Sequence, residues 1–356
     1  PSDPTGPSRD RGDSMTAHET GGMVPRWIAA LVTLFLMSLG SSAVACSLNQ
    51  TGGVYEIRTA DEFDMIGDGV SNCLVDDDYK LMYDIDFGAL PSQYTPPQST
   101  FTGSLIGDPS DAGVKALANV VLDEIGPLLE AGAGARFEDI GLVNIDYVSP
   151  SNEYVGVFGG AVSIDTSGLS VKNIVISGVN VEGAEDAGIL FGRVEGADDE
   201  TEIISIDGVF ASNSSVTGTD VGGLAGDLKH VGVSISDVVL EQPLQVAGKR
   251  AGGVVGAIQG GGTTVEPSKM QGLRVRTELI GKLADGGRGG LVGQADMNSL
   301  LTVSETSVYV QHADEELGYA VGALVGQGRS MDIRNVAVRG VVDGGYRAGG
   351  VAGYNA

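Results

Sequence analysis

The side chains in this sequence with the most evident capacity for chemistry are carboxylates that come in small groups. Asp76 and Asp78 belong to a run of three aspartates, and Asp84 and Asp86 alternate along a predicted strand. A calcium site needs about six to eight converging oxygens, and no EF-hand loop or glycine–aspartate repeat supplies the remainder. We therefore predict no cofactor, and calcium at these four aspartates stays an open hypothesis.

Nucleophilic and acid–base catalysis have no matching set of residues. The histidines His18, His230 and His312 are far apart in the sequence, and we expect the last two in solvated turns. No serine–histidine–aspartate arrangement, HExxH helix or phosphate-binding loop occurs in a suitable context. We predict no catalytic residue.

Residues 1–45 have the pattern of a leader with a secretory signal peptide. An apolar run, Trp27–Gly40, follows Arg26, and small residues then lead to Ala45. This run is shorter than the ~20 residues that a membrane-spanning helix needs. The pattern predicts a secreted or bacterial cell-surface protein with no transmembrane span in its mature chain.

The two cysteines allow two interpretations. Cleavage after Ala45 would make Cys46 the first mature residue, and export to an oxidising compartment favours a disulfide between Cys46 and Cys73. Lipidation of Cys46 is the alternative, although Ala43 stands where leucine is usual in a lipidation signal.

A glycine-rich phrase of six residues recurs through the second half of the chain, for example VGGLAG at Val221–Gly226. Its copies close at Gly160, Gly192, Gly226, Gly256, Gly293, Gly326 and Gly353. A repeat of roughly 20–50 residues is typical of solenoids, propellers and arrays. The chain is therefore a series of equivalent units, and a degenerate earlier copy occurs at Ile125–Glu130.

Each unit reads as three strands. The glycine-flanked apolar phrase, such as Gly290–Gly293, is the first, an alternating segment such as Val171–Ile176 is the second, and Val179–Gly183 is an example of the third. Alternation sends every second side chain inward, and stacked units can bury these faces by pairing ~4.8 Å apart. A helical repeat is excluded by the period of two, and a propeller would need four strands per repeat. We predict an all-β, right-handed parallel β-helix with three-strand coils and about eight rungs.

The remaining parts of the mature chain are assigned as follows. Residues 46–112 form a small N-terminal α+β cap, in which Thr59 and Glu62 open a short helix as a capping box. Residues 113–356 form the β-helix domain. Because the sequence ends just after a repeat phrase without a recognisable cap, we expect that the repeats continue in a longer protein, or that this end pairs with another subunit.

The charge of the chain restricts its partners. The net charge is −26, from 47 acidic and 21 basic residues. A nucleic-acid-binding protein needs a basic surface to neutralise phosphates, and a chain of this charge lacks one overall. We therefore exclude nucleic acid as a partner.

The positions after the closing glycines are the place where an enzyme built on this scaffold could carry acids. They are Ala161, Arg193, Asp227, Ala257, Gln294, Gln327 and Tyr354. A polysaccharide hydrolase or lyase needs paired acids that converge from adjacent rungs. We expect Arg193 and Asp227 to lie a full rung or more from any partner, so an enzyme is retained only as an alternative.

The phrases at Gly290–Gly293 and Gly222–Gly226 resemble the GLUG motif of large bacterial surface and secreted proteins. The segment YEIRTADEFDMI and the strand at Tyr79–Asp86 resemble the usual lead-in to such arrays. The asparagine that often follows the motif is matched only at Asn355. The resemblance implies an extracellular, adhesin-like or matrix protein.

We therefore expect a secreted or cell-surface protein that offers a repetitive binding surface, suited to multivalent and individually weak contacts. Its partner would be a surface glycan, another protein or further copies of itself. A structural spacer or filament subunit is the first alternative, and a polysaccharide-active enzyme is the second.

Overall fold

The computed structural model of the protein describes residues 46–90, 94–97, 99–110, 113–124, 126–197, 202–241, 244–260, 268–281, 286–296, 300–314, 320–342 and 347–355. The predicted leader lies outside these residues. No helix in the described part of the chain combines the length and the apolar character needed to cross a membrane.

Nearly all regular structure is β-strand, and the strands of the described residues form three sheets. The long sheet contains β1 (Asn49–Thr51), β2 (Val54–Ile57), β3 (Asp78–Leu81), β4 (Ile85–Asp86), β5 (Ser104–Gly107), β6 (Lys115–Leu122), β7 (Arg136–Ser149), β10 (Leu169–Ser177), β11 (Asn180–Gly183), β14 (Ile203–Ser212), β15 (Ser214–Thr217), β18 (Gly232–Ser236), β19 (Val239–Leu240), β20 (Leu244–Gly248), β23 (Ser268–Gln271), β24 (Arg274–Gly281), β27 (Leu300–Asp314) and β30 (Ser330–Val341). The first short sheet contains β8 (Tyr154–Val155), β12 (Asp186–Gly188), β16 (Asp220–Gly222), β21 (Arg250–Gly252), β25 (Gly287–Gly289), β28 (Ala320–Gly322) and β31 (Arg347–Gly349). The second short sheet contains β9 (Ala161–Ser163), β13 (Phe191–Glu195), β17 (Ala225–Lys229), β22 (Val255–Gln259), β26 (Val292–Ala295), β29 (Val325–Gly328) and β32 (Ala352–Asn355).

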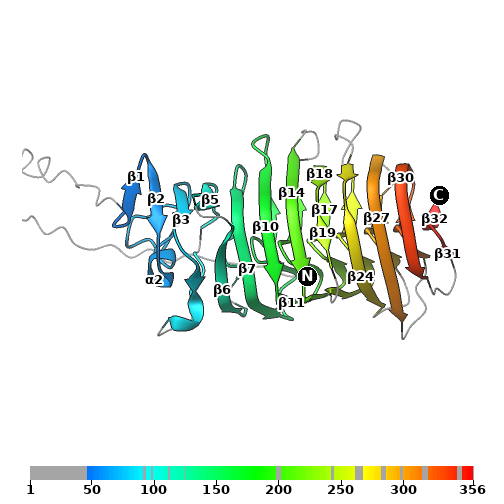
Figure 1. Cartoon of the computed structure of the whole chain (residues 1–356), viewed down its shortest axis with the longest axis horizontal. Helices are drawn as coiled ribbons and strands as arrows, with labels where there is room; N and C mark the ends of the chain where they lie inside the picture. Colours follow the sequence, from blue (N-terminus) through cyan, green and yellow to red (C-terminus); the bar gives the residue numbers. More distant parts are fainter. Residues whose placement is uncertain are drawn as a thin grey trace, which may run out of the picture. The chain divides into compact units, whose positions relative to one another are not determined.

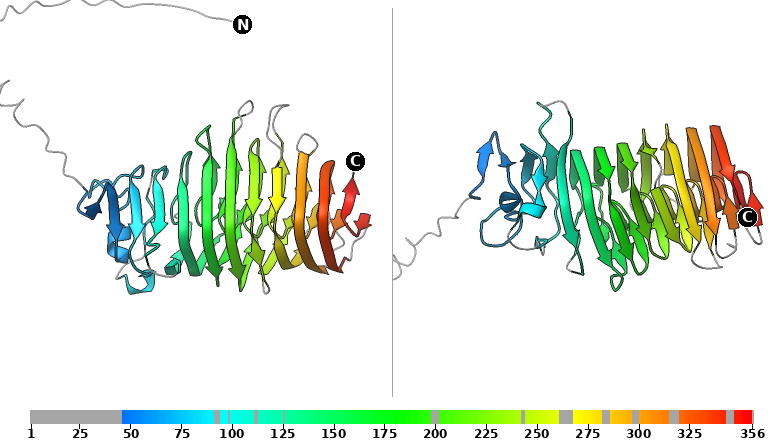
Figure 2. Two further views of the ribbon diagram at one scale, coloured as in Figure 1. Left: turned by 45° about the horizontal axis from the view of Figure 1, so that its top comes forward. Right: turned by 60° about the horizontal axis from the view of Figure 1, so that its bottom comes forward.

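The chain passes through these sheets in the same order again and again, which makes it a parallel β-solenoid. From β7 onward each coil crosses the long sheet, then the first short sheet, then the second, and pairs in parallel with its neighbouring coils. Figures 1 and 2 show the coils side by side along one axis. The predicted all-β solenoid with a small N-terminal cap and about eight rungs is confirmed.

The core is a set of columns of aliphatic side chains, one from each coil. Leu224, Val254 and Leu291 are fully buried, and the amide of each donates to the carbonyl of the equivalent residue in the next coil, as in the 2.9 Å bonds from Leu224 to Val254 and from Val254 to Leu291. Each such side chain contributes roughly 1.5–3 kcal/mol of burial free energy before entropy costs. The valines and leucines of successive coils therefore lie over one another, as the alternating pattern predicts.

The glycine phrase has a different role from the one predicted. We expected Gly290–Gly293 to form one strand, but Gly290 and Leu291 form a corner between β25 and β26. The two short strands lie so close together that a Cβ on Gly222 would overlap the carbonyl of Ala225. The repeated glycines are needed because main chain approaches main chain at this corner. The seven closing glycines named above all lie at or next to the start of the second short strand of their coil.

The long sheet is bent by a second ladder, made of residues with left-handed backbone conformation. It comprises Asp139, Asn173, Gly208, Asp237, Gly272, Glu305 and Asn335, one from each successive coil, with φ between 50° and 70°. Asparagine, aspartate and glycine tolerate this conformation, whereas in most other residues it brings Cβ too close to the main chain. The predicted second and third strands of a coil therefore lie in one bent sheet, and the short strands at the glycine corner provide the other two faces.

The N-terminal residues cap the stack and share its long sheet. β2, β3 and β5 pair in parallel with one another and then with β7, while β1 pairs with β2 in antiparallel fashion at the outer edge. The helix α2 (Ala60–Phe63) begins at Thr59, whose side chain accepts from the Glu62 amide, and a single 3₁₀ turn, η1 (Phe87–Ala89), follows β4.

A disulfide joins Cys46 to Cys73 across this cap, with Cα atoms 4.5 Å apart. Both cysteines are buried in the core cluster of the molecule. The sulfur that lipidation would require at Cys46 is thus bonded to Cys73.

Alkylation separates the disulfide from the lipidated alternative. Denatured protein treated with iodoacetamide should carry no adduct before reduction and two adducts, at Cys46 and Cys73, after it, as measured by peptide mass spectrometry. A diacylglyceryl mass on Cys46, or an adduct on Cys73 without reductant, would contradict the disulfide.

The left-handed ladder contains one residue that fits it poorly, Glu305, at φ 50°. Replacing it with asparagine, Glu305→Asn, should raise the free energy of unfolding by about 1 kcal/mol, because asparagine adopts this conformation at lower cost. The control Thr302→Asn places the same residue at an extended position of β27, where asparagine is disfavoured. Urea unfolding of both variants measures the difference, and equal effects would refute the explanation.

Candidate functional site

Two rows of side chains face each other across the glycine corner, one from the residue before each phrase and one from the residue after it. The first row is Tyr154, Asp186, Asp220, Arg250, Gly287, Ala320 and Arg347, and the second is Ala161, Arg193, Asp227, Ala257, Gln294, Gln327 and Tyr354. The charged residues of these rows concentrate in the coils of β12, β16 and β21, where Asp186, Asp220 and Asp227 are buried.

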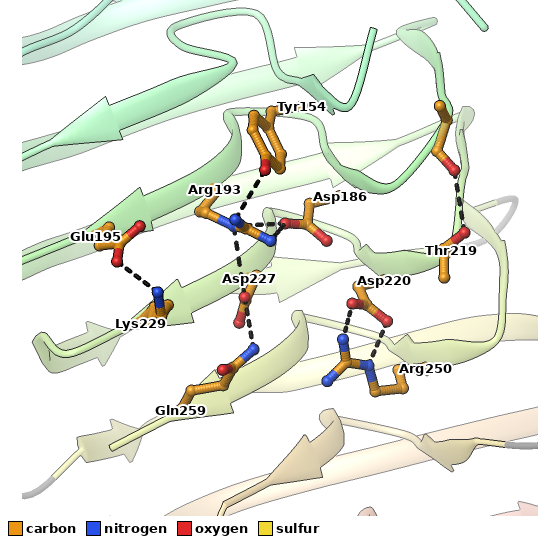
Figure 3. Close-up of polar contacts among 11 residues, drawn as sticks. Tyr154, Asp186, Arg193, Glu195, Thr219, Asp220, Asp227, Lys229, Arg250 and Gln259 are labelled. Carbon is orange, nitrogen blue, oxygen red and sulfur yellow. Dashed lines mark hydrogen bonds and ion pairs between the residues drawn. The ribbon is translucent and has the colours of Figure 1, made fainter. Parts of the chain in front are cut away.

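Arg193 is the centre of this cluster (Figure 3). Its Nη2 lies 2.6 Å from Oδ2 of Asp186 in the same coil, and its Nε lies 3.6 Å from Oδ2 of Asp227 in the next. On the other side its Nη1 donates to the hydroxyl of Tyr154 at 2.9 Å, and the guanidinium lies 4.2 Å from the centre of that ring. One arginine therefore connects three consecutive coils.

A second arginine completes the arrangement. Arg250 binds the carboxylate of Asp220 through both Nε and Nη2, across adjacent coils. Gln259 donates to Oδ2 of Asp227 at 2.8 Å, whereas Oδ1 of Asp227 is buried without a hydrogen-bond partner. Three carboxylates thus share two guanidinium groups, and the cluster would carry a net charge of −1 if every group were ionised.

Burial decides which protonation state this cluster holds. Asp227 is fully buried and Asp186 is 1% exposed. Burial, followed by the nearby Asp227 carboxylate, raises the pKa of Asp186 to about 8, and burial raises the pKa of Asp227 to about 6. We expect the pair to retain one proton near neutral pH, which leaves two negative charges against two positive ones.

A protonated acid beside an ionised one is the chemistry that a glycosidase uses. Here, however, the carboxylates are enclosed, and the groups that reach solvent are the arginines, with about a quarter of each side chain exposed (23% for Arg193 and 25% for Arg250). A substrate approaching this corner would meet the guanidinium groups first. The arrangement is suited to joining coils, since each ion pair crosses from one strand of the solenoid to another.

Our expectation that Arg193 and Asp227 would lie apart from any partner was wrong. They are adjacent in register, and Arg193 also contacts Asp186 and Tyr154 from the row that precedes the phrase. The sequence holds the signal: Asp186, Asp220 and Arg250 occupy the same position before successive phrases. This pattern indicates a charged cluster only if the phrase folds as a corner, because the corner brings the residues before the phrase close to those after it.

The four candidate calcium ligands are not brought together. Asp78 accepts from the Ser104 hydroxyl at 2.5 Å, Asp84 accepts from the Ala116 amide at 2.8 Å, and Asp86 accepts from the amides of Gly88 and the Asn119 side chain, each at 2.9 Å. Asp76 is exposed. Across the described residues there is no group of three or more His, Cys, Asp or Glu side chains that could hold a metal ion.

The two histidines that the structure describes lie in different kinds of structure. His230 follows β17 with a left-handed backbone, as expected of a turn. His312 lies inside β27 and is buried, so its predicted position in a turn was wrong. His18 lies outside the described residues.

Comparison with known proteins gives no match. No family model matches the chain, and neither a curated protein nor a solved structure matches it. The resemblance to GLUG-motif proteins therefore stays a prediction.

The corner cluster should make stability depend on pH. A carboxyl whose pKa is raised on folding stabilises the protein below its unfolded pKa of about 3.9 and loses that contribution as pH rises through its folded pKa. Asp227→Asn removes one such group and leaves two carboxylates for two arginines. Relative to the unaltered protein, the variant should gain about 1–3 kcal/mol between pH 4.5 and pH 8.

Urea unfolding at both pH values measures this gain. The control Asp207→Asn removes a half-buried carboxylate on the long sheet, which accepts from the Ser236 hydroxyl at 2.6 Å, and should show no comparable rise. If the stability difference between Asp227→Asn and the unaltered protein stays constant with pH, the shared-proton account is incorrect.

Proposed function

We propose that this protein is a secreted or cell-surface, adhesin-like binding protein that engages a surface glycan through the outer face of its coils, and that it is not an enzyme. The observation that carries the proposal is the order of the outward side chains. Several polar residues of the long sheet are hydrogen-bonded from coil to coil, which restricts their side chains before any ligand binds.

Three such contacts illustrate this order. Asn180 donates to Asp146 at 2.8 Å and accepts from the Ser215 hydroxyl at 2.6 Å, which joins three coils in one polar ladder. Further along the sheet, Gln245 donates to Glu278 at 3.0 Å. Each contact is weak because it is exposed to water.

This order favours binding because it reduces the cost of ordering side chains when a ligand binds. The same spacing recurs at every coil, so a long ligand can make many equivalent contacts whose individual weakness is offset by their number. The enclosure of Asp186 and Asp227 supports a role other than catalysis, because an acid that transfers a proton must reach its substrate.

The test is an array of extracellular polysaccharides probed with the full-length protein, followed by sizing of each glycan after incubation. We expect retention on a subset of glycans, no shortening of any of them, and unchanged retention for Asp227→Asn. Release of glycan fragments that stops in Asp227→Asn would establish the enzymatic alternative. Self-association without retention on any glycan would instead favour the structural spacer.

A further inference from the structure

Basic side chains gather at one place on this acidic protein. Arg274 and Arg276 on β24 and Arg339 on β30 surround Tyr309 on β27, beside a hollow of about 430 Å³ in the face of the long sheet. All three arginines are exposed, and Tyr309 is 39% exposed. The net charge of the chain is −26, so a site lined by three exposed arginines contrasts with the charge of the chain as a whole.

The register of the sheet sets the geometry of the hollow. Arg276, Tyr309 and Arg339 are directly paired neighbours in three consecutive coils. At the usual strand separation, the two arginines stand about 10 Å apart along the axis, with the ring between them. The guanidinium carbon of Arg276 lies 5.3 Å from the centre of the Tyr309 ring.

The charge of these arginines is not neutralised locally. No ion pair joins Arg274, Arg276 or Arg339 to a carboxylate of the described residues, whereas Arg334, on the same strand as Arg339, is paired with Asp332 at 2.5 Å. Among the described residues, Glu241, which follows β19, is the one acidic residue that lines the hollow. Three positive charges therefore face one negative charge around an exposed aromatic ring.

These groups fit a particular ligand chemistry. Guanidinium groups bind carboxylate or sulfate in paired hydrogen bonds, and an exposed aromatic ring offers a flat apolar surface to the face of a sugar. A peptide strand could not add to this part of the sheet, because both edges of β27 are already paired, with β24 and with β30. Any long polyanion, a nucleic acid included, would be repelled by the net negative charge of the chain, so the hollow suits only a short acidic segment.

We propose that this hollow, which we call the arginine–tyrosine hollow, binds a short segment of an acidic glycan. A sugar ring lies on Tyr309, and its uronate or sulfate groups bind Arg276 and Arg339. The spacing of the two arginines suits acidic groups on alternate sugars of an extended chain. The inference rests on the proposed glycan-binding function and specifies the ligand class for one site within it.

Calorimetric titration tests the site with three probes: a galacturonate oligosaccharide, its fully methyl-esterified neutral form, and poly-glutamate of matched charge. We expect the acidic oligosaccharide to bind best, with an affinity that falls as salt rises. The double variant Arg276→Gln/Arg339→Gln and the single variant Tyr309→Ala should each weaken binding at least tenfold. The matched control Arg334→Gln, outside the hollow, should bind as the unaltered protein does.

The outcomes distinguish failure of the acidic-glycan site from failure of the proposed glycan-binding function. If the double variant binds the acidic oligosaccharide normally while circular dichroism shows an intact fold, or if the neutral form or poly-glutamate binds as tightly, the hollow is not an acidic-glycan site. If the acidic oligosaccharide does not bind, while neutral glycans on the array are retained by the unaltered protein and by all variants, the general function survives and only this site is refuted. If no glycan is retained at all, the proposed function fails.

Discussion

Main-chain hydrogen bonding between successive coils is the constraint on which the rest of this structure depends. The amide and carbonyl groups of an inner coil point along the solenoid axis, so only a neighbour that follows the same path can satisfy them. Every bend must therefore recur at the same place in each coil. The corner at Gly222 and the left-handed residue at Asn173 belong to such ladders, and the register of paired strands holds although the spacing of the phrases varies.

Much of the fold could be predicted from the sequence, because the period of the glycine phrase and the alternation of apolar residues both reflect this repeated path. The corner inside the phrase could not be predicted in the same way. Gly222 has no side chain, so the pattern of inward and outward residues gives no information where the chain turns. The left-handed ladder was open to prediction, since Asn173, Asp237 and Asn335 occupy one position of the repeat, but it becomes visible only after alignment of the second strands.

The charged cluster at the corner was harder to predict, because the phrase between its members was expected to form one extended strand. Asp186 and Arg193 meet only because the chain reverses between them. Buried ion pairs of this kind add little net stability when their desolvation is counted, but removing one partner leaves an uncompensated charge. Their effect in this solenoid is to disfavour any shift of one coil against the next, since a one-residue shift would separate Arg250 from Asp220.

The uniform path of the coils also bears on how such a gene can change. A deletion or duplication that spans one whole period, for instance from Asp186 to Thr219, joins segments that already follow identical routes. The product keeps its cross-section and differs only in length, whereas the loss of a few residues within β14 would displace every later contact of that turn. Recombination between copies can thus lengthen or shorten the molecule in whole steps, and natural variants should differ by entire repeats rather than by fractions of one.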